Sequence, residues 1–248
     1  MNIAVILAGG VGSRVGAGRP KQFIDILGKP VLAYTIEAFQ NHRGIDAIEV
    51  VCHKDWKDYL KDMVEKYGLG KVRWIADGGE TFQESVLKGI FNLEGEISLD
   101  DNVLVHFGAS PFIEEDIITD CIRVCNNKGN AISTTDFYLL SAIKHSKTSV
   151  EDKDNYTCQY IDRDSIACMS TPHAFKYGFI LDLYKEAIRT GVINEVEPHT
   201  TTLMQKMGKP IYFSKGSQTN IKITRKEDLD LFEGYVLMKQ KRKNVENN

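Results

Sequence analysis

Residues 2–22 constrain the fold of this chain more than any other stretch. Residues 3–8 form a continuous apolar run without polar alternation, a pattern typical of a parallel strand that is covered on both faces. Glycine lets the backbone adopt positive φ and approach a ligand closely, and successive amides in such a turn form an anion-binding concavity. The glycines that follow the apolar run are Gly9, Gly10, Gly12, Gly16 and Gly18.

The charges in this glycine-rich stretch favour a polyphosphate ligand. Arg14, Arg19 and Lys21 stand among the glycines, and clustered cations suit phosphate better than a single carboxylate. The dinucleotide fingerprint fails because Val15 stands where its last glycine belongs. The P-loop fingerprint fails because Lys21 is followed by glutamine. A plain strand-to-helix linker is the simpler alternative, but Arg14 and Lys21 at these positions favour a phosphate loop.

Composition limits the classes of partner. The net charge of −3 gives no electrostatic reason to expect a nucleic acid. No run of about 18 apolar residues occurs, and no basic segment precedes residues 3–8, so we expect no membrane partner. The five cysteines include no C-x-x-C pair and are expected to be reduced thiols. These features predict a cytoplasmic protein.

Alternating strand and helix patterns predict an α/β fold. The expected architecture is Rossmann-like, a mostly parallel twisted sheet flanked by helices. Ligands of such sheets bind at the carboxyl ends of the strands, where residues 9–12, 77–80 and 106–111 are expected to meet. Further strands are expected at 47–52, 72–76, 103–107 and 211–213, and helices at 29–39, 55–67, 81–92, 114–126, 178–190 and 225–238.

The sequence changes character after Asp136. Residues 145–163 are dense in charged and hydroxyl side chains, and a loop this long is functional or an extended arm. Aromatic and β-branched residues around it favour a protruding β-arm, a hairpin at about 137–165. We therefore expect a single domain over residues 1–238, including the arm, followed by a polar tail at 239–248.

Several motifs, in order along nearly the whole chain, together resemble one enzyme family. These motifs are Ala8–Arg14 (A-G-G-x-G-x-R) with Pro20-Lys21-Gln22, Asp77-Gly78-Gly79 with Ser85, Asp162-Arg163, Thr171-Pro172, and Asn220 to Thr224 (N-I-K-I-T). The family comprises the methylerythritol-phosphate and ribitol-phosphate cytidylyltransferases, which are nucleotidyltransferases. The resemblance implies attack by an alcohol phosphate on the α-phosphorus of CTP, with release of pyrophosphate. It also implies a homodimer formed through the arm.

The resemblance assigns a role to each matching residue. The phosphate loop at Ala8, Gly9, Gly10 and Gly12 would cradle the triphosphate of CTP, and Arg14 and Lys21 would neutralise it. Lys222 would face the α-phosphate, and Arg163 would grip the phosphate of the polyol acceptor, acting in the neighbouring subunit of the dimer. Cytosine and ribose would be held by Asp77, Gly78, Gly79 and Ser85.

The chain departs from the family pattern on the metal and acceptor side. Phe107 stands where the family has an aspartate that binds Mg²⁺, and Thr219 stands where it has a second carboxylate. Ser110 and Phe82 replace arginines, and residues 198–200 replace an acidic acceptor motif. Mg²⁺ binds oxygen ligands and keeps several waters. We therefore expect no protein metal ligand, and Mg²⁺ delivered with CTP.

Three hypotheses follow. The favoured one is an active cytidylyltransferase that joins CTP to a small polyol phosphate such as ribitol 5-phosphate or methylerythritol 4-phosphate. The alternative is a catalytically degenerate nucleotide-binding paralogue or partner subunit, as loss of both carboxylates would suggest. A nicotinamide-dependent oxidoreductase shares only the sheet and a broken fingerprint. His106 is interpreted as a packed histidine with a backbone hydrogen bond, while Thr200 either lines the acceptor pocket or caps a helix.

Overall fold

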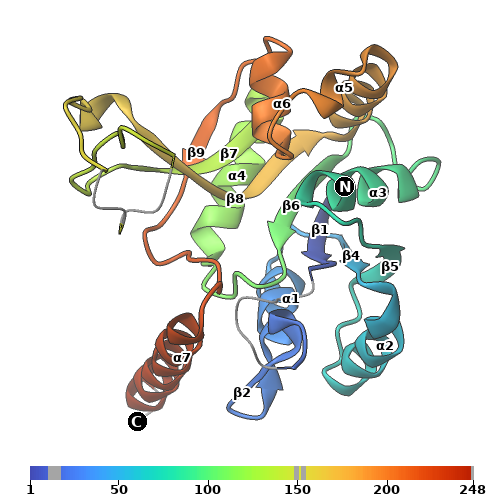
Figure 1. Ribbon diagram of the computed structural model, residues 1–248. Coiled ribbons are helices and arrows are strands. Elements are labelled where there is room, and N and C mark those ends of the chain that lie inside the picture. Colours follow the sequence, from blue (N-terminus) through green and yellow to red (C-terminus); the bar gives the residue numbers. More distant parts are fainter. Residues whose placement is uncertain (11–17, 148–150, 152–154, 247–248) are drawn as a thin grey trace.

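The computed structural model describes residues 1–10, 18–147, 151 and 155–246, and its centre is one large sheet (Figure 1). The strand order is β5-β4-β1-β6-β8-β7-β9, and a second sheet pairs β2 with β3. The strands are β1 (Asn2–Ala8), β2 (Asp25–Ile26), β3 (Lys29–Pro30), β4 (Ala47–Cys52), β5 (Val72–Asp77), β6 (Asn102–Phe107), β7 (Asn130–Asp136), β8 (Ala167–Lys176) and β9 (Phe213–Lys215).

Seven α-helices accompany these strands in the described part of the chain. They are α1 (Val31–Asn41), α2 (Lys57–Lys66), α3 (Phe82–Asn92), α4 (Glu115–Lys128), α5 (Tyr177–Thr190), α6 (Thr200–Lys206) and α7 (Lys226–Glu246). One buried cluster joins the sheet to α1, α2 and α4, and another joins it to α3, α5 and α6. The sheet is therefore covered on both faces, as expected for this fold class.

Strand β1 shows why the sequence specifies a central position. It pairs in parallel with β4 on one side and β6 on the other. Ile6 belongs to the cluster beneath α1, α2 and α4, whereas Val5 belongs to the cluster on the opposite face. Because both faces are packed, every position from Ile3 to Ala8 is apolar and buried. Each such side chain contributes on the order of 1–3 kcal/mol by leaving water.

The parallel half of the sheet matches the sequence expectation. The other half contains β7 and β8, two strands that the sequence patterns did not predict. Strand β8 runs antiparallel between β6 and β7. It contains Pro172, whose missing N–H argues against a central strand when only the sequence is considered. The strand expected at 211–213 begins later, because β9 covers Phe213–Lys215 and pairs in parallel with β7.

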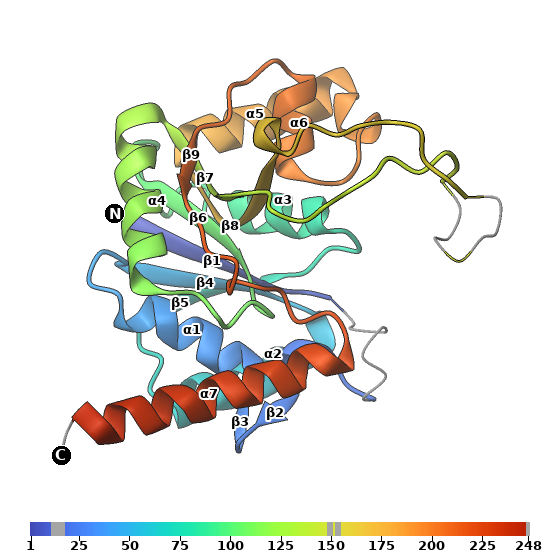
Figure 2. The same ribbon diagram turned by 90° about the vertical axis from the view of Figure 1, so that its left-hand side faces the viewer.

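The long segment between β7 and β8 extends away from the sheet (Figure 2). In its described residues up to Asp162 no strand forms, so the β-structure expected for the arm is not observed there. Its two sides meet where the His145 N–H donates to the Tyr156 carbonyl at 2.8 Å and the two rings stack at 4.4 Å. A two-stranded ribbon with no third strand or helix to pack on is only marginally stable.

Helix α7 continues beyond Met238 to Glu246, so residues 239–246 of the expected polar tail are helical. The basic run there is partly anchored, since Lys239 Nζ lies 2.8 Å from Glu114 Oε1 and 4.8 Å from the Tyr235 ring centroid. The start of the helix packs through Phe232 and Val236 onto Ile223. Helix α7 therefore anchors the segment that carries Lys222.

Candidate active site

The turn after β1 begins at a point where backbones pack closely. A Cβ on Gly9 would lie 3.1 Å from Gly78 Cα and 3.2 Å from Ser85 Oγ. A Cβ on Gly78 would lie 2.8 Å from Gly9 Cα. Two of the glycines predicted to bind ligand therefore also allow the ends of β1 and β5 to approach each other.

Gln22 holds the end of β1 from the other side. Its Nε2 donates to the carbonyls of Ala8 and Gly10, each at 2.7 Å, and the residue is 2% exposed. Gln22 belongs to the Pro20-Lys21-Gln22 motif, and no role for it was predicted. The signal was present, because a glutamine is rarely buried unless its amide is hydrogen-bonded.

The turn between β5 and α3 forms the next wall. The Gly79 N–H donates to Ser85 Oγ at 3.0 Å, and the Thr81 side chain caps α3 by accepting from the Glu84 N–H at 3.1 Å. The Thr81 side chain thereby satisfies an amide that the first helical turn leaves unpaired, and Ser85 ties the preceding Gly79 to the helix. The result is a fixed turn beside Gly9.

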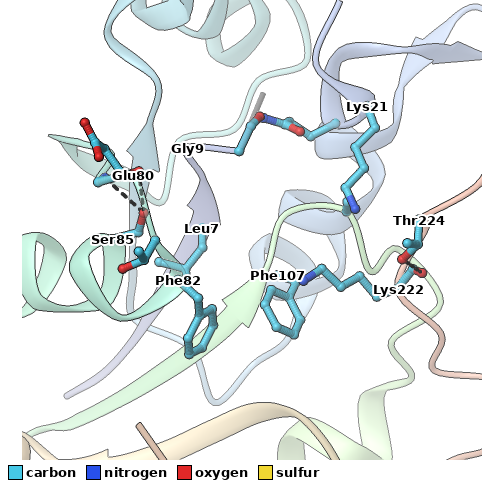
Figure 3. Close-up of a pocket in the computed structure, with 14 residues that line it drawn as sticks. Leu7, Gly9, Lys21, Glu80, Phe82, Ser85, Phe107, Lys222 and Thr224 are labelled. Atoms are coloured by element: carbon cyan, nitrogen blue, oxygen red, sulfur yellow. Dashed lines mark hydrogen bonds between the residues drawn. The ribbon is translucent and has the colours of Figure 1, made fainter. Parts of the chain in front are cut away.

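These turns surround a cavity of about 210 Å³ at the carboxyl ends of β1, β5 and β6 (Figure 3). The predicted residues Gly9, Gly10, Lys21, Gly79, Ser85 and Lys222 all line it. Three stretches far apart in the sequence therefore meet, as the strand pattern indicated. The remaining lining residues are Leu7, Gln22, Glu80, Thr81, Phe82, Phe107, Ala109 and Thr224.

Two lysines bring positive charge to this cavity. Lys21 lies in a 3-10 turn, and its ammonium donates to the carbonyl of Ile223. The Lys222 ammonium lies 3.5 Å from the centroid of the Phe107 ring. Glu80 is the single acidic residue among the lining residues that the structure describes. The cavity is thus suited to an anionic group.

Aromatic rings form the wall beside Lys222. The ring centroids of Phe107 and Phe82 are 5.1 Å apart, and those of Phe82 and His199 are also 5.1 Å apart. His199 precedes α6 without capping it through its side chain, while Thr200 is buried and its Oγ1 lies 2.8 Å from the Tyr184 hydroxyl. Three departures from the family pattern, at positions 82, 107 and 199, are therefore neighbours in space.

Two histidines beneath the site are neutral near pH 7. Burial lowers the pKa of His106 to about 4 and that of His173 to about 3. His106 Nε2 lies 2.9 Å from the Ser110 carbonyl, to which its N–H donates, as the sequence interpretation expected. A fully buried imidazole that already uses this nitrogen supports the structure and is a poor general base.

The described residues offer Mg²⁺ no cluster of protein ligands at the positions where the family resemblance implies them. No group of three or more His, Cys, Asp or Glu side chains that could hold a metal occurs among them. At the cavity itself, the Phe107 ring has no oxygen to offer a hard cation. The Thr219 hydroxyl is engaged with Ser217 Oγ at 2.7 Å.

Not every predicted residue reaches the cavity. Asp77 pairs with Lys57 at 2.7 Å, which lowers its pKa, and is not among the lining residues. Arg163 is exposed on the arm, where its Nη1 donates to the Tyr138 carbonyl at 2.9 Å. Ala8 is buried and does not line the cavity, although its chain neighbours Leu7 and Gly9 do. Gly12 and Arg14 lie outside the described residues.

Comparison with known proteins identifies the family. The model of the 2-C-methyl-D-erythritol 4-phosphate cytidylyltransferase family (IspD) matches residues 2–238. The chain belongs to this family. The resemblance inferred from the motifs is therefore confirmed.

Relatives with two different acceptor names are similar to this chain. A ribitol-5-phosphate cytidylyltransferase of Lacticaseibacillus paracasei is 35% identical over 97% of this chain and 100% of that protein. A 2-C-methyl-D-erythritol 4-phosphate cytidylyltransferase of Clostridium novyi is 36% identical over 94% of this chain and 95% of that protein. Membership of the IspD family therefore does not by itself select the acceptor.

The fold comparison agrees with the sequence comparison. The crystal structure of a 4-diphosphocytidyl-2C-methyl-D-erythritol synthase from Anaerococcus prevotii superposes with a TM-score of 0.75. The two proteins are 26% identical, and the match covers 96% of this chain and 98% of that one.

None of the helices in the described part of the chain is both long and apolar enough to cross a membrane.

Proposed function

We propose that this chain catalyses transfer of CMP from CTP to a small polyol phosphate. An oxygen of the acceptor phosphate forms a bond to the α-phosphorus of CTP. The bond to the oxygen bridging the α- and β-phosphates breaks, and its electron pair leaves with pyrophosphate. The observation that carries the proposal is the cavity in which Lys21 and Lys222 face glycine turns at the strand ends.

The assigned roles follow the chemistry of this step. The transition state places negative charge on the phosphate oxygens, so fixed donors and cations stabilise it more than the ground state. We assign Lys21 and Lys222 to stabilising that charge, and the Gly9 and Gly10 amides to binding the phosphates. The Gly79 N–H already donates to Ser85 Oγ, so Gly79 contributes through the shape of the turn that holds cytosine and ribose. Arg14 and Gly12 complete the phosphate loop, with Ala8 behind it and Ser85 bracing the Gly79 turn. Asp77 and Gly78 act by shaping that turn.

The acceptor is a phosphorylated open-chain alcohol. Relatives are named for ribitol 5-phosphate and for methylerythritol 4-phosphate, and these compounds share a phosphate nucleophile on a short polyol. Residues 1–238 act as one nucleotidyltransferase domain, which is supported by a family match over residues 2–238. Mg²⁺ accompanies CTP, bound to its phosphates and water, since Phe107 offers no ligand. The comparisons do not support the alternative of a degenerate paralogue.

The arm contributes to a homodimer in this proposal. Its described part exposes large apolar side chains, namely Tyr138, Leu139, Leu140, Ile143, Tyr156 and Tyr160. A contiguous exposed apolar surface is typical of a protein interface. Arg163 stands at the base of the arm outside its own cavity, so it acts at the acceptor phosphate of the partner subunit. Neither nucleic acid nor membrane takes part.

The reaction takes place in the cytoplasm. Cysteine usage supports this assignment, because Cys52, Cys121 and Cys125 are buried free thiols, and Cys158 and Cys168 are free as well. Structural disulfides are typical of oxidising compartments, whereas free thiols are usual in reducing ones.

The direct test measures pyrophosphate release with purified protein and Mg²⁺. Each of CTP, UTP, ATP and GTP is combined with ribitol 5-phosphate, methylerythritol 4-phosphate or no acceptor. We expect release with CTP and one polyol phosphate, and a CDP-alcohol as the second product by mass spectrometry. Nucleotide binding without turnover for any polyol phosphate would instead support the degenerate paralogue.

A further inference from the structure

Phe107 and Lys222 form a direct contact at the wall of the cavity. The Lys222 Nζ lies 3.5 Å from the centroid of the Phe107 ring (Figure 3). The face of an aromatic ring carries partial negative charge and attracts a cation within about 6 Å. Both residues line the cavity. The ring therefore holds an ammonium where a phosphate ligand would enter.

The Phe107 ring also packs against a second aromatic ring, that of Phe82. Phe82, at the start of α3, packs against it with an interplanar angle of 52°, and His199 packs against Phe82 in turn. Aromatic pairs at centroid distances of about 4.5–7 Å attract each other beyond their burial. Side chains from α3 and the segment before α6 thus fix the orientation of a ring at the end of β6.

The backbones that carry Phe107 and Lys222 are also joined. The Phe107 N–H points to Thr171 Oγ1 at 3.5 Å, and Asn220 Nδ2 donates to the Thr171 carbonyl at 2.6 Å. Asn220 lies two positions before Lys222. Thr171 of β8 therefore links the end of β6, which carries Phe107, to the segment that carries Lys222. The backbones on both sides of the contact are held in place, so the contact does not depend only on two flexible side chains.

A neutral ring has a different effect on Lys222 from that of a carboxylate. An aspartate at position 107 would form an ion pair with the ammonium and offset its charge within the cavity. The ring face orients the ammonium without adding a negative charge. The cavity thereby keeps a stronger positive field for phosphate, and the only acidic lining residue that the structure describes is Glu80.

We propose that Phe107 is a positioning residue that holds the Lys222 ammonium toward the phosphates of CTP. According to the motif resemblance, the ring stands at the end of β6 where the family pattern has a carboxylate. This inference rests on the proposed function for the identity of the ligand. The contact between the ring and the ammonium stands independently of that ligand.

Calorimetric titration with CTP at a fixed Mg²⁺ concentration tests the role. We expect Phe107→Leu, which keeps an apolar side chain but removes the ring face, to weaken CTP binding about tenfold. That change equals about 1.4 kcal/mol, within the range of cation–π contacts. Phe107→Tyr keeps the ring and should bind CTP within about twofold of wild type. Phe91→Leu, at a half-buried phenylalanine of α3 outside the cavity, is the matched control.

A double-mutant cycle with Lys222→Met separates positioning from general damage. If the ring acts through Lys222, Phe107→Leu should weaken CTP binding no further in the Lys222→Met background. An equal tenfold loss in both backgrounds would overturn the proposal. Unchanged CTP binding by Phe107→Leu in the otherwise wild-type chain would overturn it as well.

The contact can be measured without nucleotide by NMR. Ring current from Phe107 should shift the Lys222 Hε signals upfield in the wild type, and Phe107→Leu should abolish the shift. The Lys222→Met spectrum assigns these signals. Absence of the shift in the wild type would overturn the proposal, whatever the CTP result. A wild-type chain that shows the shift but binds no CTP contradicts the proposed function and the role assigned to Phe107 within it.

Discussion

At the residue scale, Lys21 joins segments that lie 202 positions apart. Its ammonium donates to the carbonyl of Ile223, so one cation touches both the turn after β1 and the segment leading to α7. Lys222 reaches the same cavity from that second segment. The paired cations concentrate positive charge at a cavity whose one acidic lining residue, in the part of the chain that the structure describes, is Glu80.

Replacing Lys21 by methionine should reduce turnover by about 100-fold or more, because removing one donor to transition-state charge costs about 2.7–4 kcal/mol. Pyrophosphate release under saturating CTP and acceptor measures the effect. Lys61→Met, at an exposed lysine that pairs with Asp58 within α2, is the control and should keep full activity. Full activity of Lys21→Met with an unchanged melting temperature would remove Lys21 from the catalytic assignment.

A second residue-scale prediction concerns Glu49, which is fully buried in β4. Burial raises its pKa to about 8, although Asn92 Nδ2 donates to its Oε1 at 2.7 Å. The folded protein therefore keeps this carboxyl protonated at pH values where the unfolded chain ionises it. Its contribution to stability is fully present below about pH 4.5 and is lost as the pH rises towards about 8.

Glu49→Gln should remove this pH dependence. We expect the wild type to lose about 1.4 kcal/mol of unfolding free energy per pH unit over part of this window, while the variant loses less. Urea unfolding at several pH values between 5 and 9 measures both slopes. Parallel curves for the two proteins would show that Glu49 is not the group responsible.

At the element scale, the turn from β5 to α3 has little space for side chains. A Cβ at Gly79 would lie 2.3 Å from Glu84 Cβ and 2.9 Å from the Ser85 nitrogen. These atoms belong to the capped first turn of α3, which cannot move without breaking the Gly79–Ser85 hydrogen bond. The requirement for glycine here therefore comes from packing against the helix.

Gly79→Ala should destabilise the protein by about 1–3 kcal/mol, as other overpacked positions do, and should weaken CTP binding by displacing the cavity wall. Thermal unfolding and calorimetric CTP titration measure the two effects. Gly70→Ala is the control, because a Cβ there meets nothing within 4 Å. If Gly79→Ala matches Gly70→Ala in both measurements, the turn is more adaptable than the packing indicates.

At the scale of the whole molecule, the arm between β7 and β8 extends away from the sheet (Figure 2) and carries large exposed apolar side chains. Arg163 lies in the 3-10 turn Arg163–Ser165, where the arm returns to β8. If Arg163 completes the site of the partner subunit, two different inactive variants should restore activity when they form a mixed dimer. Arg163→Ala and Lys222→Met homodimers should each be nearly inactive. Mixing and reassociating them should restore up to about one quarter of wild-type activity, since half of random dimers are mixed and each has one intact site.

Pyrophosphate release before and after reassociation measures this recovery. The control mixes Arg163→Ala with a chain carrying both substitutions, which cannot form an intact site. Sedimentation of the wild type should show a dimer. A fully active monomer, or no recovery from dimers that demonstrably exchange subunits, would place Arg163 outside the partner's site.

Much of the parallel half of the fold could be predicted because its signals are local. The apolar run of β1 and the glycines after it each specify a neighbouring backbone conformation. Once parallel strands are inferred, their carboxyl ends must meet, so Gly9 and Gly79 could be placed together in advance. The positions of Lys21 and Lys222 followed from the motif resemblance and are consistent with the cavity.

Other features of the fold and of the site depend on contacts between residues that are distant in the sequence, and only the tertiary structure shows them. Strand β8 enters the sheet because β6 and β7 lie on its two sides, despite its proline. Asp77 forms an ion pair with Lys57, and the Gln22 side chain donates hydrogen bonds to the carbonyls of Ala8 and Gly10. The sequence by itself determined the fold class and the edge that carries the site. Which side chains face the cavity, and that Phe107 holds Lys222, depended on packing between elements that no local pattern encodes.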